Sequence, residues 1–197
     1  MIKALAKASF PRMYYRLARW KHLGEPLDFS KHYTDTDPTP CPALIALAPR
    51  IPSYVDTLFI PGCAPGRDFN ACPELKPWGI DIVPFNQIKW CCFPKYEQIS
   101  LEGWTARLFA EDFATADLSR VLVFTNGLLM YVPFEWQWKF YDAIRACGCK
   151  NMIFHEPPFY DKEYGRHRGH KFFHLDSMDF KLEQHHPILR TWIKLDE

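Results

Sequence analysis

The sequence has no long apolar run, little net charge and no cysteine motif. None of its apolar runs approaches the ~18 residues that a helix needs to span a bilayer, and it contains no signal-peptide core. Its 24 lysines and arginines nearly balance its 23 acids, which excludes a global field for nucleic acid or anionic membranes. Its seven cysteines form neither a C-x-x-C pair nor a repeated metal-ligand spacing. We therefore expect a cytoplasmic protein with free thiols, no membrane span and no metal site.

The composition is that of an ordinary globular protein, with 48% hydrophobic and 24% charged residues in a chain of 197. Residues 1–31 hold seven lysines and arginines against two acids, which predicts a basic N-terminal helical arm and loop over 1–41. A single domain is expected over 42–197. The acid-free opening is also typical of a mitochondrial transit peptide, and that alternative stays open. Aromatic residues within the arm indicate packing against the body more than nucleic-acid binding.

Short apolar runs alternate with helical patterns along the body. Strands are expected at 55–60, 78–84, 105–113, 121–125 and 149–158, with a last candidate at 188–196. Helices are expected at 43–50, 67–75 and 134–148. This alternation predicts an α/β fold in which a mostly parallel sheet is flanked by helices on both faces. Ligands of such sheets bind at the carboxyl ends of the strands.

Glycine and polar residues stand at the end of each of the first five expected strands. In chain order they are Gly62-Cys63-Ala64-Pro65-Gly66, Asp81, Glu111-Asp112, Asn126-Gly127 and His155-Glu156. A glycine loop lets the backbone approach a ligand closely, and a carboxylate about 20 residues later can accept both hydroxyls of a ribose. We therefore expect these residues to meet at one edge of the sheet.

In these segments the sequence resembles the class I S-adenosylmethionine-dependent methyltransferases, over residues 42 to 158. The resemblance is carried by GCAPG at 62–66, GIDIVP with Asp81, AEDF with Asp112 and VLVFTNGLLMYVP at 121–133. It implies a Rossmann-like methyltransferase fold and S-adenosyl-L-methionine as the cofactor. A nicotinamide dinucleotide is the alternative, but Pro65 fits poorly with the G-x-G-x-x-G loop that a pyrophosphate needs.

The resemblance also implies which residues contact the cofactor. The loop of Gly62, Cys63, Ala64 and Gly66 would face its methionine part, Asp81 with Ile82 its ribose side, Asp112 with Phe113 its adenine, and Asn126 with Gly127 would close the site. The family usually has a glycine where Ala64 stands and an acid where Ile60 stands. A contact to the methionine amino group must therefore come from another residue or from water.

Methyl transfer is an in-line displacement at carbon, so the enzyme mainly aligns the acceptor and removes water around it. An acceptor oxygen or nitrogen can also need a base. Tyr131, after the fourth expected strand, and His155 and Glu156, after the fifth, are the candidate catalytic residues.

The expected acceptor is a small molecule. PGC at 61–63 and GRD at 66–68 look like the thiol methyltransferase branch, whereas TNGLLMYVP and HEPPFY look more like enzymes of surface-sugar biosynthesis. Arg166 and Arg168 favour an anionic acceptor such as a phosphorylated or nucleotide-linked sugar. Sugar acceptors are placed slightly ahead of thiols.

Three points stay open at this stage. His170 and His174 are spaced for one metal only if their segment is helical, and a polar segment is the simpler interpretation. A non-catalytic protein that retains the fold and binds the cofactor or a partner is the rival to an enzyme. The sequence does not indicate the oligomeric state.

Overall fold

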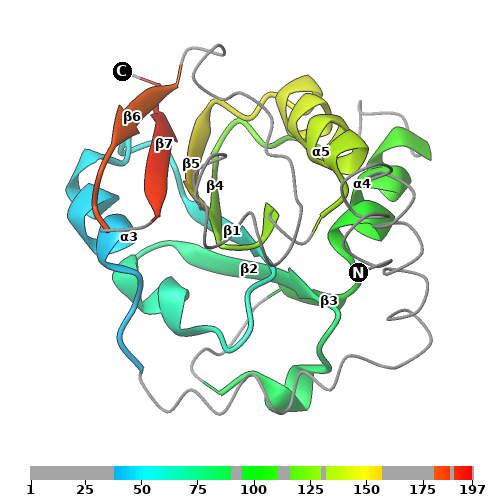
Figure 1. Ribbon diagram of the computed structural model, residues 1–197, viewed down its shortest axis with the longest axis horizontal. Coiled ribbons are helices and arrows are strands. Elements are labelled where there is room, and N and C mark those ends of the chain that lie inside the picture. The colour runs from blue at the N-terminus through cyan, green and yellow to red at the C-terminus, as the bar shows by residue number, and fades with distance from the viewer. Residues whose placement is uncertain are drawn as a thin grey trace, which may run out of the picture.

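The computed structural model describes residues 38–89, 95–110, 116–129, 132–156, 180–186 and 189–196, and a seven-stranded sheet forms its centre (Figure 1). The strands are β1 (Thr57–Pro61), β2 (Lys76–Asp81), β3 (Lys95–Gln98), β4 (Val121–Asn126), β5 (Asn151–Glu156), β6 (Lys181–Glu183) and β7 (Arg190–Lys194). The α-helices are α3 (Pro42–Leu47), α4 (Leu101–Ala110) and α5 (Phe134–Ala146). Short 3₁₀ helices are η2 (Ala48–Arg50), η3 (Arg67–Ala71) and η4 (Phe85–Gln87).

The strand order is β3-β2-β1-β4-β5-β7-β6. The first five strands run parallel, and β7 runs antiparallel to both β5 and β6. The predicted α/β fold with a mostly parallel sheet is therefore confirmed. The chain builds outward from β1 through β2 to β3, then returns to the other side of β1 to build β4 and β5. The order thus reverses between β1 and β4, which is where open α/β sheets bind ligands.

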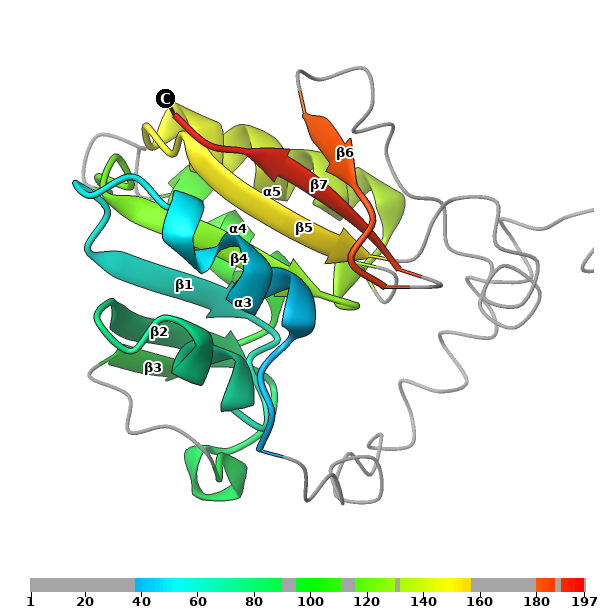
Figure 2. The ribbon, with the colours of Figure 1, turned by 90° about the vertical axis from the view of Figure 1, so that its left-hand side faces the viewer.

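Helices cover both faces of the sheet, with α3 on one face and α4 and α5 on the other (Figure 2). Alternate strand residues point to opposite faces, so Phe59 packs with the α4 and α5 side while Ile60 packs with the α3 side. On the α4 and α5 side, the rings of Phe59 and Trp78 lie 4.4 Å apart, and that of Trp104 is 4.8 Å from Phe59. Both faces are apolar because both are buried under helices.

The expected third strand at 105–113 is wrong. Residues up to Ala110 belong to helix α4, because Leu101, Trp104 and Leu108 recur at helical spacing and bury one face of that helix. The true third strand is β3, whose KYEQ sequence lies in a stretch without a clear pattern. The expected helix at 67–75 is also shorter, since only the 3₁₀ helix η3 forms there.

The other expected elements are present with shifted ends, including the last strand candidate, which is β7. Strand β6 was not expected, and it pairs with β7 to form an antiparallel hairpin. The basic arm lies outside the described residues, apart from 38–41, so its helical structure stays a prediction. Within the described ranges, no helix is long and apolar enough to cross a membrane.

Candidate functional site

The loop after β1 is built on two left-handed glycines. Gly62 has a φ of 67° and Gly66 a φ of 96°, a conformation that only glycine adopts readily. The Gly62 N–H donates to the carbonyl oxygen of Ile80 at 2.8 Å, and the Ala64 N–H donates to Oδ2 of Asp81 at 3.0 Å. The first part of the loop, residues 62–64, is therefore fastened to β2.

Asp81 ends β2 with a side chain that is only 6% exposed. Besides Ala64, its carboxylate accepts a 3.0 Å hydrogen bond from the Val83 N–H. Burial raises the pKa of Asp81 above its usual value, while backbone N–H groups from Ala64, Val83 and Ile82 act in the opposite direction. An ionised carboxylate has about four acceptor positions, so ligand hydroxyls can still bind beside these amides.

Two apolar side chains stand exposed next to this buried acid. Ile82 is 47% exposed and Phe85 is 51% exposed. The segment that carries them is braced on β3, because the Tyr96 hydroxyl donates to the Val83 carbonyl oxygen and Gln98 Nε2 donates to that of Ile82 at 3.3 Å. A fixed apolar surface beside a hydrogen-bonding acid suits a ligand with a flat ring on one side and hydroxyls on the other.

The end of β4 faces the β1 loop across the point where the strand order reverses. Gly127 is left-handed, with a φ of 64°, and its N–H donates to the His155 carbonyl oxygen at 2.9 Å. Among the described residues other than Gly127 and its two chain neighbours, no atom lies within 4 Å of the position that a Cβ on Gly127 would take. The side chain of Leu128 lies over Gly62, where an added Cβ would come within 2.6 Å of it. The β4 loop therefore closes against the β1 loop.

Sequence reasoning assigned no role to Asp68, although the structure connects it to two distant segments. Its Oδ1 accepts a hydrogen bond from the Cys41 N–H at 2.8 Å, and its Oδ2 accepts one from Asn126 Nδ2 at 3.1 Å. The available signal was an acid in the first turn of η3, just after the left-handed Gly66 that precedes this helix.

Two buried polar side chains hold the loop between β4 and α5. Glu156 is fully buried, and its Oε1 accepts hydrogen bonds from the N–H groups of Leu128 and Leu129, both at 3.2 Å. From the α5 side, Gln137 Nε2 donates to the carbonyl oxygens of Leu129 and Val132 at 2.8 and 2.9 Å. Gln137 is the second residue that the sequence did not reveal, because a lone glutamine on an amphipathic helix ordinarily faces solvent.

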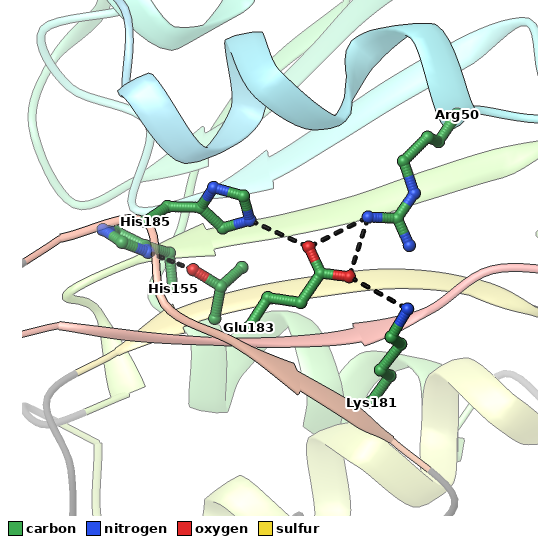
Figure 3. Close-up of polar contacts among 6 residues, drawn as sticks. Arg50, His155, Lys181, Glu183 and His185 are labelled. Atoms are coloured by element: carbon green, nitrogen blue, oxygen red, sulfur yellow. Dashed lines mark hydrogen bonds and ion pairs between the residues drawn. The ribbon is translucent and has the colours of Figure 1, made fainter.

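His155 lies on the α3 face of β5 and is 2% exposed. Its Nδ1 is 2.8 Å from the Thr191 Oγ1, a contact seen in Figure 3 beside the cluster around Glu183. Burial, together with the nearby His186 and His185, lowers the pKa of His155 to about 4. The imidazole is therefore neutral at physiological pH and ties β5 to β7.

The structure thus gathers the β1 loop, Asp81 with Ile82, Asn126 with Gly127, and the β5 end at one edge of the sheet. Asp112, Phe113 and Tyr131 lie outside the described residues, as do Arg166, Arg168, His170 and His174. Asp112 follows helix α4 instead of a strand, so the reason for assigning it to adenine is lost. Across the described part of the chain, no three His, Cys, Asp or Glu side chains group as a metal site.

No family model matches the sequence, and no curated protein matches it either. Solved structures do match. A 1,6-didemethyltoxoflavin-N1-methyltransferase from Burkholderia thailandensis aligns with 95% of this chain and 92% of its own, at 14% identity and a TM-score of 0.52. The chain has a Rossmann-like methyltransferase fold.

Two further structures share this fold. Magnesium protoporphyrin IX methyltransferase from Synechocystis, solved with bound S-adenosylmethionine, aligns with 98% of this chain and 97% of its own, at 12% identity and a TM-score of 0.50. An O-methyltransferase family protein from Burkholderia thailandensis aligns with 79% of this chain and 55% of its own, at 10% identity and a TM-score of 0.50. At these identities the likeness concerns the fold, and the chemistry has to be argued from the site.

Proposed function

We propose that this protein is an S-adenosylmethionine-dependent methyltransferase that acts on a small molecule. The observation that carries the proposal is the hydrogen bond from the Ala64 N–H to Asp81 Oδ2 at 3.0 Å. It joins a glycine loop after β1 to an acid at the end of β2, beside the point where the strand order reverses. Such a crevice binds nucleoside-containing ligands in this class of sheet.

The residues present fit the parts of this cofactor. Asp81 keeps acceptor positions for ribose hydroxyls, and the exposed Ile82 and Phe85 offer an apolar surface to the adenine. The left-handed Gly62 and Gly66 bring backbone close to the methionine part. When bound, the cofactor supplies a methyl group on a sulfonium, whose C–S bond breaks as the bond to the acceptor atom forms.

The proposed acceptor is a small molecule, and within that class a sugar or nucleotide-sugar. Two proteins that share the fold are named for magnesium protoporphyrin IX and 1,6-didemethyltoxoflavin, which are small molecules. A sugar or nucleotide-sugar acceptor, anionic in character, is proposed from the sequence alone. The alternatives are a thiol acceptor and a non-catalytic protein that keeps the fold.

For an acceptor that needs a base, the proposed residues are Tyr131, His155 and Glu156. The contacts of His155 with Thr191, and of Glu156 with the loop amides, favour positioning roles for these two. We also propose a cytoplasmic location and a single domain over 42–197 preceded by the basic arm.

Calorimetry with S-adenosylmethionine and S-adenosylhomocysteine tests the cofactor assignment. Both should bind the wild-type protein, and Asp81→Ala should weaken both by about 10-fold or more because a buried acceptor is lost. Asp56→Ala is the control, since Asp56 pairs with Lys76 and Arg120 at the opposite edge of the sheet. If neither ligand binds the wild-type protein, the proposed function is wrong. If binding is seen, cofactor turnover in a metabolite screen identifies the acceptor and separates an enzyme from a non-catalytic binder.

A further inference from the structure

Ile60 offers no charge to a ligand at the end of β1. Its side chain is 2% exposed and packs in the apolar cluster on the α3 side, together with Cys41, Cys63 and Phe69. S-adenosylmethionine carries an ammonium group on its methionine part, and an ammonium in a crevice needs an acceptor, best of all a carboxylate. The inference that follows rests on the proposed function, in which S-adenosylmethionine is the cofactor.

Three described carboxylates stand near the ends of β1, β2 and β5, and they differ in what they can still bind. Asp81 lies on the β2 side, where it holds Ala64 and Val83. Glu156 is fully buried behind the amides of Leu128 and Leu129. The side chain of Asp68 is 13% exposed and accepts a hydrogen bond from Asn126 at the end of β4, so it combines partial access with a place between the ends of β1 and β4.

We propose that the Asp68 carboxylate, held between the Cys41 N–H and the Asn126 amide, binds the ammonium group of the methionine part of the cofactor. Its next residue, Phe69, and its partner Cys41 belong to the same apolar cluster as Ile60, the position where the acid is missing. Asn126 stands at the end of β4, the parallel neighbour of β1, which places the carboxylate between the two strand ends.

The carboxylate of Asp68 has acceptor positions to spare. Two hydrogen bonds, from Cys41 and Asn126, use two of its about four positions. The nearest cation on the described chain is Arg67, whose Nε is 4.0 Å from Oδ1, at the outer limit of an ion pair. Both hydrogen-bond donors are neutral, so they orient the carboxylate without removing its negative charge, and the single ion pair with Arg67 is a long one.

Three adenosine ligands separate this role from a structural one. S-adenosylhomocysteine carries the ammonium and the carboxylate, its deamino analogue keeps only the carboxylate, and 5′-methylthioadenosine lacks both. In calorimetry, Asp68→Asn should weaken S-adenosylhomocysteine by roughly 10- to 100-fold, as expected for a charge-assisted hydrogen bond. The same variant should bind the other two ligands within about 2-fold of wild type.

Binding of 5′-methylthioadenosine to Asp68→Asn also shows that the variant is folded at this site. Equal losses for all three ligands, or unchanged binding of S-adenosylhomocysteine, would overturn the assignment of Asp68. Failure of the wild-type protein to bind any of them would instead overturn the proposed function. Asp56→Asn is the matched carboxylate control at the opposite edge and should leave all three affinities unchanged.

Discussion

The backbone N–H of Ala64 donates a 3.0 Å hydrogen bond to Oδ2 of Asp81, joining the loop after β1 to the end of β2. The same carboxylate accepts a second bond from Val83. A single buried side chain therefore holds both the glycine loop and the exposed segment of Ile82 and Phe85 in place. This acid is therefore one of the contacts that determine the shape of the candidate site, beside those of Gly62, Tyr96 and Gln98.

Replacing Asp81 by asparagine should lower both stability and cofactor affinity. An amide has one acceptor oxygen, so one backbone N–H is left facing an NH₂ group, and the free energy of unfolding should fall by about 1–3 kcal/mol. Urea denaturation of Asp81→Asn measures this loss. Asp56→Asn, at the exposed amino edge, should change stability little. Equal effects of the two variants would contradict the role of Asp81.

Glu156 and Gln137 should be energetically coupled, because both hold the loop between β4 and α5. Glu156→Met and Gln137→Met should each cost about 1–3 kcal/mol of stability, since each leaves buried backbone groups unpaired. The double variant should depart from additivity by about 0.5 kcal/mol or more. A cycle of Gln137→Met with the distant Asp56→Asn is the control and should be additive within about 0.5 kcal/mol. Additive effects of the Glu156 and Gln137 substitutions would show that the two side chains hold the loop independently.

Acidification should destabilise the fold through His155. The pKa of this residue is about 4 in the folded protein, below the ordinary 6.5 that applies to the unfolded chain. As the pH falls from 6.5 toward 4, the unfolded chain takes up a proton that the folded protein does not bind, so stability is lost over this window. Unfolding free energies at about pH 7 and about pH 5 should differ less in His155→Asn than in wild type. An unchanged difference would mean that other groups control the acid sensitivity.

Two buried threonines should respond oppositely to replacement by valine. Thr125 and Thr191 are both fully buried, but Thr191 Oγ1 contacts His155 Nδ1, whereas Thr125 Oγ1 has no hydrogen-bond partner in the described ranges. Thr125→Val should therefore leave stability unchanged or raise it by about 1 kcal/mol, because an unpaired hydroxyl is removed. Thr191→Val should lower it by about 1–2 kcal/mol. Thermal unfolding compares the pair directly, and a loss in Thr125→Val would indicate that its hydroxyl is satisfied.

The sequence predicted those parts of the fold that buried apolar patterns determine. Strands β1, β2, β4 and β5 were found because both their faces are buried, which leaves continuous apolar runs ended by glycine, proline or acids. Strands β3 and β6 were missed because KYEQ and KLE are short, polar and at the edges of the sheet. Helix α4 was mistaken for a strand because the expected range, 105–113, left out Leu101 and Trp104, which with Leu108 form the buried face at helical spacing.

The sequence likewise predicted only those residues of the candidate site that have a local sequence signal. Glycines with positive φ and an acid at a strand end leave a direct mark on the sequence, so Gly62, Gly66 and Asp81 were found. Asp68 and Gln137 act through contacts with residues distant in the sequence or with backbone atoms, and neither is visible without the fold. The bonded partners of Glu156 and His155 were likewise invisible, although both residues had been singled out.

The position of β7 inside the sheet bears on how the chain folds as the ribosome makes it. Residues 190–194 pair with β5 on one side and with β6 on the other, although they are synthesised after both. Until they emerge, β5 is an unprotected edge strand whose Ile153 lacks its neighbour Ile193. Translation that stalls before residue 190 would thus leave a nearly complete parallel sheet with an apolar edge, a species prone to aggregate.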